Sequence, residues 1–207
     1  PLHTAMFNIM GASIAVVWVM TLLIAIALFR NRWGDAARSL GIRAGAILAL
    51  IGMAVAFLMV TPTERQIATD SDFVGAHTVG LSDGGPGLPL LGWSTVAGDL
   101  RVPHFVGMHA LQVLPLFVIL LELLAVRGGP RLQALGDPRV RLRLVVVAVV
   151  TYAVTIVVLT WQALSAQSVV RPAGAVLIAG SLVAAVAISS AIAILVAGRQ
   201  RERELTR

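Results

Sequence analysis

Long apolar runs separated by polar connections make up most of the chain. Five of these runs, over residues 5–29, 42–60, 104–126, 144–164 and 174–197, are long enough to be helices that cross a membrane. A hydrocarbon core of roughly 30 Å takes about 20 helical residues. Because backbone polar groups cannot go unpaired in lipid, each run predicts a transmembrane helix. The pattern therefore predicts an all-α integral membrane protein, with residues 1–207 as one polytopic bundle of about five helices.

Composition and charge agree with this class and add an orientation. Hydrophobic residues make up 58% of the chain, charged residues 13%, and the mean hydropathy is +0.91. The net charge of +6 comes from arginine with no lysine, a usage typical of a GC-rich bacterial genome, and we expect no nucleic-acid partner. Most arginines lie in the connections 30–41 and 127–143 and in the tail 198–207. The positive-inside rule makes these segments cytoplasmic, which predicts a multi-pass protein of a bacterial plasma membrane.

The remaining long connection, residues 61–103, then lies outside the cell. It is glycine-rich and long for a loop without evident secondary structure, so we expect it to be functional or disordered. Its segment GLPLLGW, residues 87–93, is too apolar for a solvated linker and is expected to lie back on the bundle or at the lipid interface. The preceding SDGGPG, residues 82–87, is turn chemistry in which glycine supplies positive φ.

All four histidines, His3, His77, His104 and His109, fall on this outer side. Histidine is the commonest metal ligand and the usual proton-transfer group near neutral pH. A divalent metal site would use His77, His104 or His109 with Asp99, although no HExxH or comparable spacing is present. A b-type haem would need facing histidines, for example His3 with His109. Copper could use outer thioethers beside the histidines, namely those of Met6, Met10, Met59 and Met108.

Several polar residues lie within the outer halves of the spans. His109, Gln112, Asn8 and Gln162 are expected at similar depths, where polar groups usually face the bundle interior. They predict either a cavity open to the outside or hydrogen bonds between helices alone. His104 and His109 are about 140° apart around a regular helix, so they cannot bind one ion from a single face. His104, His109 and Gln112 are therefore candidate cofactor-binding residues only together with groups from other elements.

Two acidic residues, Glu122 and Asp99, can be explained by a structural role as well as by a functional one. Glu122 is the only carboxylate within a span and could be a proton or ion relay. It also lies near the cytoplasmic end of its helix, where it could reach the interface or Arg127. Asp99 and Arg101 fit an ion pair in the loop or a cap on the third helix.

Small residues recur at helical spacing on two spans, where they would let helices approach closely in lipid. The stripes predict tight packing within the chain, or an interface with a second copy or a partner membrane subunit. They consist of Gly45, Ala49, Gly52 and Ala56 on the second span, and Gly180, Ala184, Ala187 and Ala191 on the fifth.

Four segments resemble an uncharacterised family of bacterial multi-pass membrane proteins: the opening PLHTAMFNIMGA, GAHTVG, DGGPGLPLLGWS and GDLRVPHFVGMHALQVLP. The resemblance covers most of the chain through Pro115. It implies that further spans precede Pro1, ending in a Ser-His-Phe-Asn stretch, and that they would complete any ligand set. It implies no catalytic residue, because no activity is established for the family.

The patterns together predict an outward-facing polar pocket of histidine, aspartate and glutamine side chains. Its expected use is binding of a divalent metal or haem, or histidine-dependent chemistry on a small or lipidic molecule. A transporter or channel component lined by Glu122, Gln112 and Gln162, and a scaffold or accessory subunit, are the alternatives. Whether the protein is an enzyme stays open.

Overall fold

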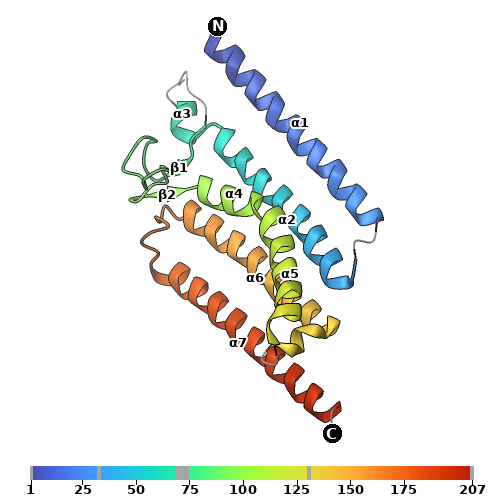
Figure 1. Ribbon diagram of the computed structural model, residues 1–207. Helices are drawn as coiled ribbons and strands as arrows, with labels where there is room; N and C mark the ends of the chain where they lie inside the picture. Colours follow the sequence, from blue (N-terminus) through green and yellow to red (C-terminus); the bar gives the residue numbers. More distant parts are fainter. Residues whose placement is uncertain (1, 32–33, 69–74, 130–131, 206–207) are drawn as a thin grey trace.

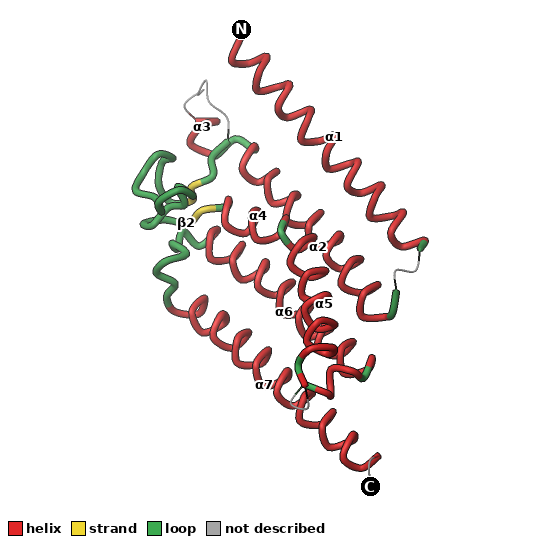
Figure 2. Tube along the Cα trace, viewed as in Figure 1, coloured by secondary structure: helices red, strands yellow, loops and turns green. Residues whose placement is uncertain are grey.

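The computed structural model describes residues 2–31, 34–68, 75–129 and 132–205, and helices form most of that part (Figures 1 and 2). Within it, five helices are long and apolar enough to cross a membrane: α1, α2, α5, α6 and α7. The predicted all-α membrane bundle is therefore confirmed. The elements are α1 (Leu2–Arg30), α2 (Ala36–Val60), α3 (Glu64–Ala68), β1 (Thr78–Val79), β2 (Gly98–Asp99), α4 (Arg101–Met108), α5 (Ala110–Arg127), the 3-10 helix η2 (Gln133–Gly136), α6 (Pro138–Leu164) and α7 (Gly174–Leu205).

Several helices extend beyond the apolar runs, because polar capping groups rather than hydropathy fix their ends. Asp35 caps α2 by accepting a hydrogen bond from the Arg38 N–H at 2.9 Å. Asp137 caps α6 in the same way through Arg139 at 2.8 Å, and Pro138 occupies the first turn, where its missing N–H costs nothing. The helix therefore begins well before residue 144, and arginines extend its first turns.

The spanning helices form a bundle centred on α2, α5 and α6, which pack against one another. Helix α2 also packs against α1 and α4, while α6 also packs against α7. Helices α1 and α7 thus form the two edges of the bundle, as Figure 1 shows. The main apolar core lies between α2, α5 and α6, around Leu114, Val118, Leu121 and Val145.

Glycines bring α2 very close to α4 and α5. A Cβ added at Gly45 would lie 2.9 Å from the Ala110 carbonyl oxygen, and one at Gly52 would clash with the backbone of Gly107. This small-residue stripe therefore serves packing within the chain. On α7 the corresponding Gly180 differs, since a Cβ there would meet nothing within 4 Å.

The third span is interrupted at His109, which separates α4 from α5. Helix α4 begins at Arg101 rather than at His104. Residues 101–103, which the sequence assigned to the long connection, therefore belong to the same helix as the start of the apolar run. Pro115 lies inside α5 and cannot donate a backbone hydrogen bond to the preceding turn. The interruption and the proline together allow α4 and α5 to follow different directions along α2.

The two ends of the bundle differ in which helices begin or finish there and in their charge. At one end, called the loop end here, α2 and α6 finish, α4 and α7 begin, and the long connection is folded. At the opposite, arginine-rich end, α2 and α6 begin and α5 and α7 finish. Figure 2 shows the loops gathered at the loop end, beside β1 and β2.

Candidate functional site

A short strand pair organises the loop end. Strands β1 and β2 are antiparallel, with Thr78 opposite Asp99 and Val79 opposite Gly98. The Leu100 N–H also donates to the His77 carbonyl oxygen at 2.9 Å. Gly98 approaches α6 so closely that a Cβ there would clash with the Ala163 carbonyl. The long connection is thus held against the end of α6, and its glycine is required at this contact.

Asp99 is the centre of the folded loop. Its side chain is only 2% exposed, and it forms an ion pair with Arg101 at 2.7 Å. One carboxylate oxygen accepts from the Arg101 backbone N–H and Nε, both at 3.0 Å, and the other from the Ser94 N–H at 2.9 Å. Burial by itself would raise the pKa of Asp99, but the hydrogen bonds from Arg101 and Ser94 outweigh it and hold the pKa below its ordinary value. Asp99 is therefore the partner of Arg101 in the expected loop ion pair, and it also accepts the first backbone N–H of α4, whose N-cap residue is Leu100.

His77 lies beside Asp99 and is flanked by a second carboxylate. Its Nδ1 is 3.4 Å from an Asp83 oxygen, 3.9 Å from Asp99 and 3.2 Å from the Thr78 hydroxyl. Asp83 also accepts from the backbone N–H groups of His77 and Thr78, at 3.3 and 2.8 Å. Burial would raise the pKa of Asp83, whereas these donors lower it to a net value below the ordinary one. Gly84 follows with a φ of 92°, which confirms the predicted glycine turn.

A chain of polar contacts ties the loop to α6 and to the connection before α7. The Ser168 hydroxyl donates to the Ser94 carbonyl at 3.0 Å, and the Gln162 amide nitrogen donates to the Ser168 carbonyl at 2.9 Å. Ser94, Gln162 and Ser168 are all buried. Gln162 therefore connects the loop-end cluster to the membrane-spanning part of α6.

The apolar segment 87–93 folds into a tight turn with an exposed tip. The Leu88 N–H donates to the Trp93 carbonyl at 2.8 Å, and Leu90 has a φ of 67° and is fully exposed. Trp93 packs edge-on against Phe105 of α4, with ring centroids 5.4 Å apart. The tryptophan end of this segment thus lies on the bundle, while the leucine tip points away from it.

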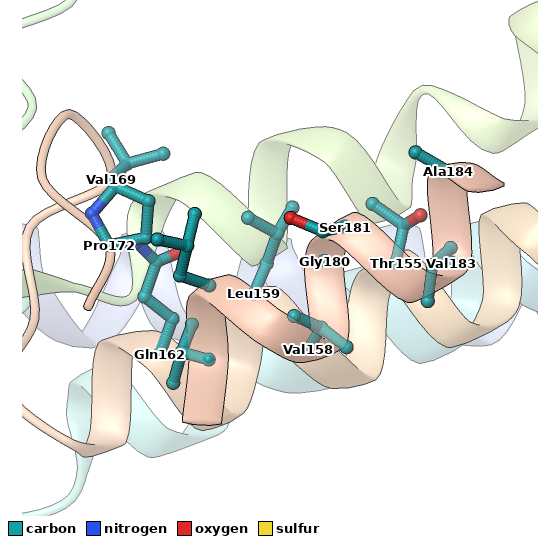
Figure 3. A pocket seen from close by; sticks show the side chains of 12 residues that line it. Thr155, Val158, Leu159, Gln162, Val169, Pro172, Gly180, Ser181, Val183 and Ala184 are labelled. Carbon is teal, nitrogen blue, oxygen red and sulfur yellow. The ribbon is translucent and has the colours of Figure 1, made fainter. Parts of the chain in front are cut away.

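A groove of about 430 Å³ runs between α6 and α7 (Figure 3). Val158 and Leu159 of α6 and Val176, Leu177 and Val183 of α7 line most of it. Its polar lining comes from Thr155, Gln162 and Ser181. Figure 3 shows Gln162 near Val169 and Pro172, at the groove's loop end. The groove is open at Gly180, because no atom lies within 4 Å of the space a side chain would occupy there.

The two histidines of the third span have separate backbone partners. His104 Nδ1 lies 2.8 Å from the Gly52 carbonyl oxygen of α2. His109 Nδ1 lies 2.7 Å from the Phe105 carbonyl oxygen, and its ring stacks on Phe105 at 4.0 Å. Since a carbonyl only accepts, Nδ1 carries the proton in both rings. His104 therefore joins two helices, whereas His109 lies at the break between α4 and α5.

The other residues of the expected polar layer have different surroundings. Gln162 is buried beside Ser168, while Gln112 is exposed on α5. The side chains of Asn8 and His3 lie outside the described residues. The structure thus gives Gln112 and Gln162 separate environments, one on an exposed helix face and one in the groove.

Glu122 pairs with Arg38 of α2 rather than with Arg127. The guanidinium donates to both carboxylate oxygens, with Nε–Oε1 at 2.8 Å and Nη2–Oε2 at 2.6 Å. A second ion pair, between Arg141 and Asp35 at 3.0 Å, joins α6 to the start of α2. Both pairs lie at the arginine-rich end and connect helices there.

The structure brings together only part of the expected metal set. His77 and Asp99 are neighbours, while His104 and His109 are engaged with carbonyl groups elsewhere. Arg101 and Ser94 occupy both oxygens of Asp99, and the guanidinium would repel a cation. Within the described part of the chain, no three His, Asp or Glu side chains are arranged to hold a metal ion.

Comparison with models of known protein families, with curated proteins and with solved structures found no match for the chain.

Three residues of these clusters carry no signal in the sequence. Ser94 and Ser168 are buried partners of the loop cluster, and Arg38 is the partner of Glu122. Serines in loops and arginines next to spans are common, and each contact joins positions far apart in the chain. Of the contacts between the loop and α6, only the Gln162 amide could be detected in the sequence, because it is a polar group within an apolar run. It indicates a buried hydrogen bond but does not identify the partner.

Proposed function

We propose that this protein is a multi-pass protein of a bacterial plasma membrane that holds one lipid-like amphiphile in the groove between α6 and α7. The observation that carries the proposal is the groove itself, about 430 Å³ in volume and lined mainly by aliphatic side chains. Ligand sites are concave, largely apolar and equipped with a few polar groups that fix orientation. An acyl or isoprenoid chain lying along α6 would match that lining.

The polar end of the ligand would lie at the loop end, beside Gln162. The amide nitrogen of Gln162 is bonded to Ser168, and no donor among the described contacts reaches its carbonyl oxygen. Among the described residues, Arg141 Nε is the only fully enclosed side-chain nitrogen or oxygen without a partner, so the Gln162 oxygen is not fully enclosed, and Gln162 itself lines the groove. It is available to accept a hydrogen bond from an amine or hydroxyl head group.

The orientation belongs to the same proposal. Arginines cluster at the arginine-rich end, and the positive-inside rule makes that end cytoplasmic, with the loop end outside. The chain has no cysteine, so single cysteines can report sidedness. A Gly84→Cys variant should react with an impermeant maleimide in intact cells and Gly129→Cys only after lysis. The reverse pattern would contradict the orientation.

Filling the groove tests the binding proposal directly. A leucine at Gly180 would enter open space, so Gly180→Leu should keep the fold while occupying the site. The matched control is Ala185→Leu, which adds similar bulk on the same helix at an exposed position outside the groove lining.

Native mass spectrometry in detergent with added phosphatidylethanolamine provides the readout. Wild type and Ala185→Leu should retain one bound lipid per chain, and Gly180→Leu should lose it several-fold at an unchanged melting temperature. Equal lipid retention by Gly180→Leu and wild type would overturn the proposal.

A further inference from the structure

One face of α4 and α5 is exposed along its whole length although it carries polar groups. Phe105, Leu116, Ile119 and Leu123 are 39%, 61%, 45% and 45% exposed, and Gln112 is exposed between them. With His109, these residues follow one another at steps of three and four, which places them on one face. The opposite face, containing Gly107, Ala110, Leu114, Val118 and Leu121, is buried against the rest of the bundle. The exposed set is called the Gln112 face below.

The side-chain amide of Gln112 would be energetically unfavourable on a helix face that contacts only lipid. It lies inside a helix that is apolar enough to span the membrane, and no described contact gives its side chain a hydrogen bond. Moving an unpaired amide from water into hydrocarbon is strongly unfavourable, because it loses its hydrogen bonds to water without replacement. Acyl chains offer neither donors nor acceptors. The amide therefore indicates a polar partner at the same depth.

His109 supplies a second unused group on this face. Its Nδ1–H donates to the Phe105 carbonyl, so Nε2 of the neutral ring is an acceptor. The Gln112 face thus offers two amide N–H donors, an amide oxygen and an imidazole nitrogen within one turn of helix.

We propose that the Gln112 face binds the same face of a second copy of this chain. Two copies inserted in the same direction place Gln112 opposite the partner's Gln112, because equal residues lie at equal depth in a parallel two-fold pair. Each amide is both donor and acceptor, so the two bond reciprocally. The second N–H of each amide is then available to the partner's His109. Polar side chains of this kind associate helices in membranes.

The rest of the surface fits the same arrangement. Leu116, Ile119 and Leu123 continue the face toward the arginine-rich end at the spacing used by left-handed helix pairs. Of the two small-residue stripes, that of α2 is already occupied by α4 and α5, and Gly180 and Ala184 of the α7 stripe line the lipid groove. The lipid groove lies between α6 and α7, so this inference does not depend on the proposed function.

Single-cysteine crosslinking in native membranes tests the pair, since the chain has no other cysteine. Leu116→Cys lies on the Gln112 face, whereas Leu111→Cys, the control, is also exposed but lies about 140° from Leu116 around the helix. Leu116→Cys should yield a disulfide-linked dimer of this chain on mild oxidation, and Leu111→Cys should not.

The contribution of the amide is tested by adding Gln112→Leu to Leu116→Cys. Crosslinking should fall roughly 3- to 18-fold, the range given by membrane hydrogen bonds of about 0.6–1.7 kcal/mol. Gln200 is exposed and remote from this face, so adding Gln200→Leu to Leu116→Cys instead should leave the amount of crosslinked dimer unchanged. Melting temperatures of all variants report that the fold is kept.

Three results would overturn the proposal. They are equal crosslinking of Leu116→Cys and Leu111→Cys, no effect of Gln112→Leu on the dimer, and a crosslinked product whose mass shows a different protein on this face.

Discussion

The contact between Gly52 of α2 and Gly107 of α4 makes a sharp prediction about stability. A Cβ added at Gly52 would lie 2.5 Å from the Met108 nitrogen and closer still to the Gly107 backbone. Non-bonded atoms prefer about 3.5–4.0 Å, so Gly52→Ala must push the two helices apart by about 1 Å. All the atoms that it meets are backbone, and no side chain can rotate away.

Two costs add up in this variant. Overpacking of a well-packed contact costs about 1–3 kcal/mol. The displacement also stretches the bond between His104 Nδ1 and the Gly52 carbonyl, now 2.8 Å, which contributes about 0.5–1.5 kcal/mol. These costs sum to about 1.5–4.5 kcal/mol, and the helix preference of alanine over glycine offsets up to about 1 kcal/mol, so we expect Gly52→Ala to lower the free energy of unfolding by about 1–4 kcal/mol.

The assay is SDS-induced unfolding in mixed micelles, followed by the fluorescence of the tryptophans. Gly180→Ala is the control, because its Cβ meets nothing and alanine favours helix over glycine by up to about 1 kcal/mol. Wild-type stability of Gly52→Ala, or an equal loss in Gly180→Ala, would refute the close-packing argument.

Two further predictions concern the charged clusters. The pKa of Asp99 is lowered in the fold, so its contribution to stability is present above the ordinary pKa of 3.8 and is lost as the pH falls through the lower folded value. The protection factors of residues 94–100 against hydrogen exchange should fall below about pH 4 in wild type, whereas they should be low in Asp99→Asn with no such step; a step retained in Asp99→Asn would point to another group. At the arginine-rich end, Glu122→Arg should lower the melting temperature, because it replaces a bidentate ion pair with two like charges. The double variant Arg38→Glu with Glu122→Arg reverses the two charges and should restore part of the melting temperature. A double variant no more stable than Glu122→Arg would show that the contact is not an ion pair in the membrane.

The helical architecture could be predicted from the sequence because hydropathy reports directly on the environment of each span. All five apolar runs became helices. Their ends could not be predicted as well, since hydropathy does not register the caps Asp35 and Asp137 or the helical turns that extend past the lipid.

The sequence also could not show how the loop folds. Strands β1 and β2 are two residues each, too short for a periodic pattern, and they pair across the intervening residues 80–97. The Asp99–Arg101 contact is local and could be expected. By contrast, Glu122 and Arg38 are 84 residues apart, and only the packing of α5 on α2 brings them together.

Helical spacing predicted that His104 and His109 do not share one face of the third span. It indicated that His104 and His109 point in different directions, and the structure gives them separate partners on α2 and α4. The groove had no sequence signature of its own, because its lining residues resemble those of any lipid-facing helix. Part of it is left open at Gly180, where a Cβ would meet nothing within 4 Å.

Photocrosslinking in membranes tests the proposed lipid site most directly. Wild-type protein would be reconstituted with phosphatidylethanolamine that carries a diazirine in its acyl chain, and labelled residues would be mapped by mass spectrometry. Residues of the groove, such as Val158 and Leu177, should be labelled more densely than exposed residues of α1, such as Val16 and Ile24. Equal or denser labelling along α1 would show that the groove holds lipid no better than any exposed helix and would contradict the proposal.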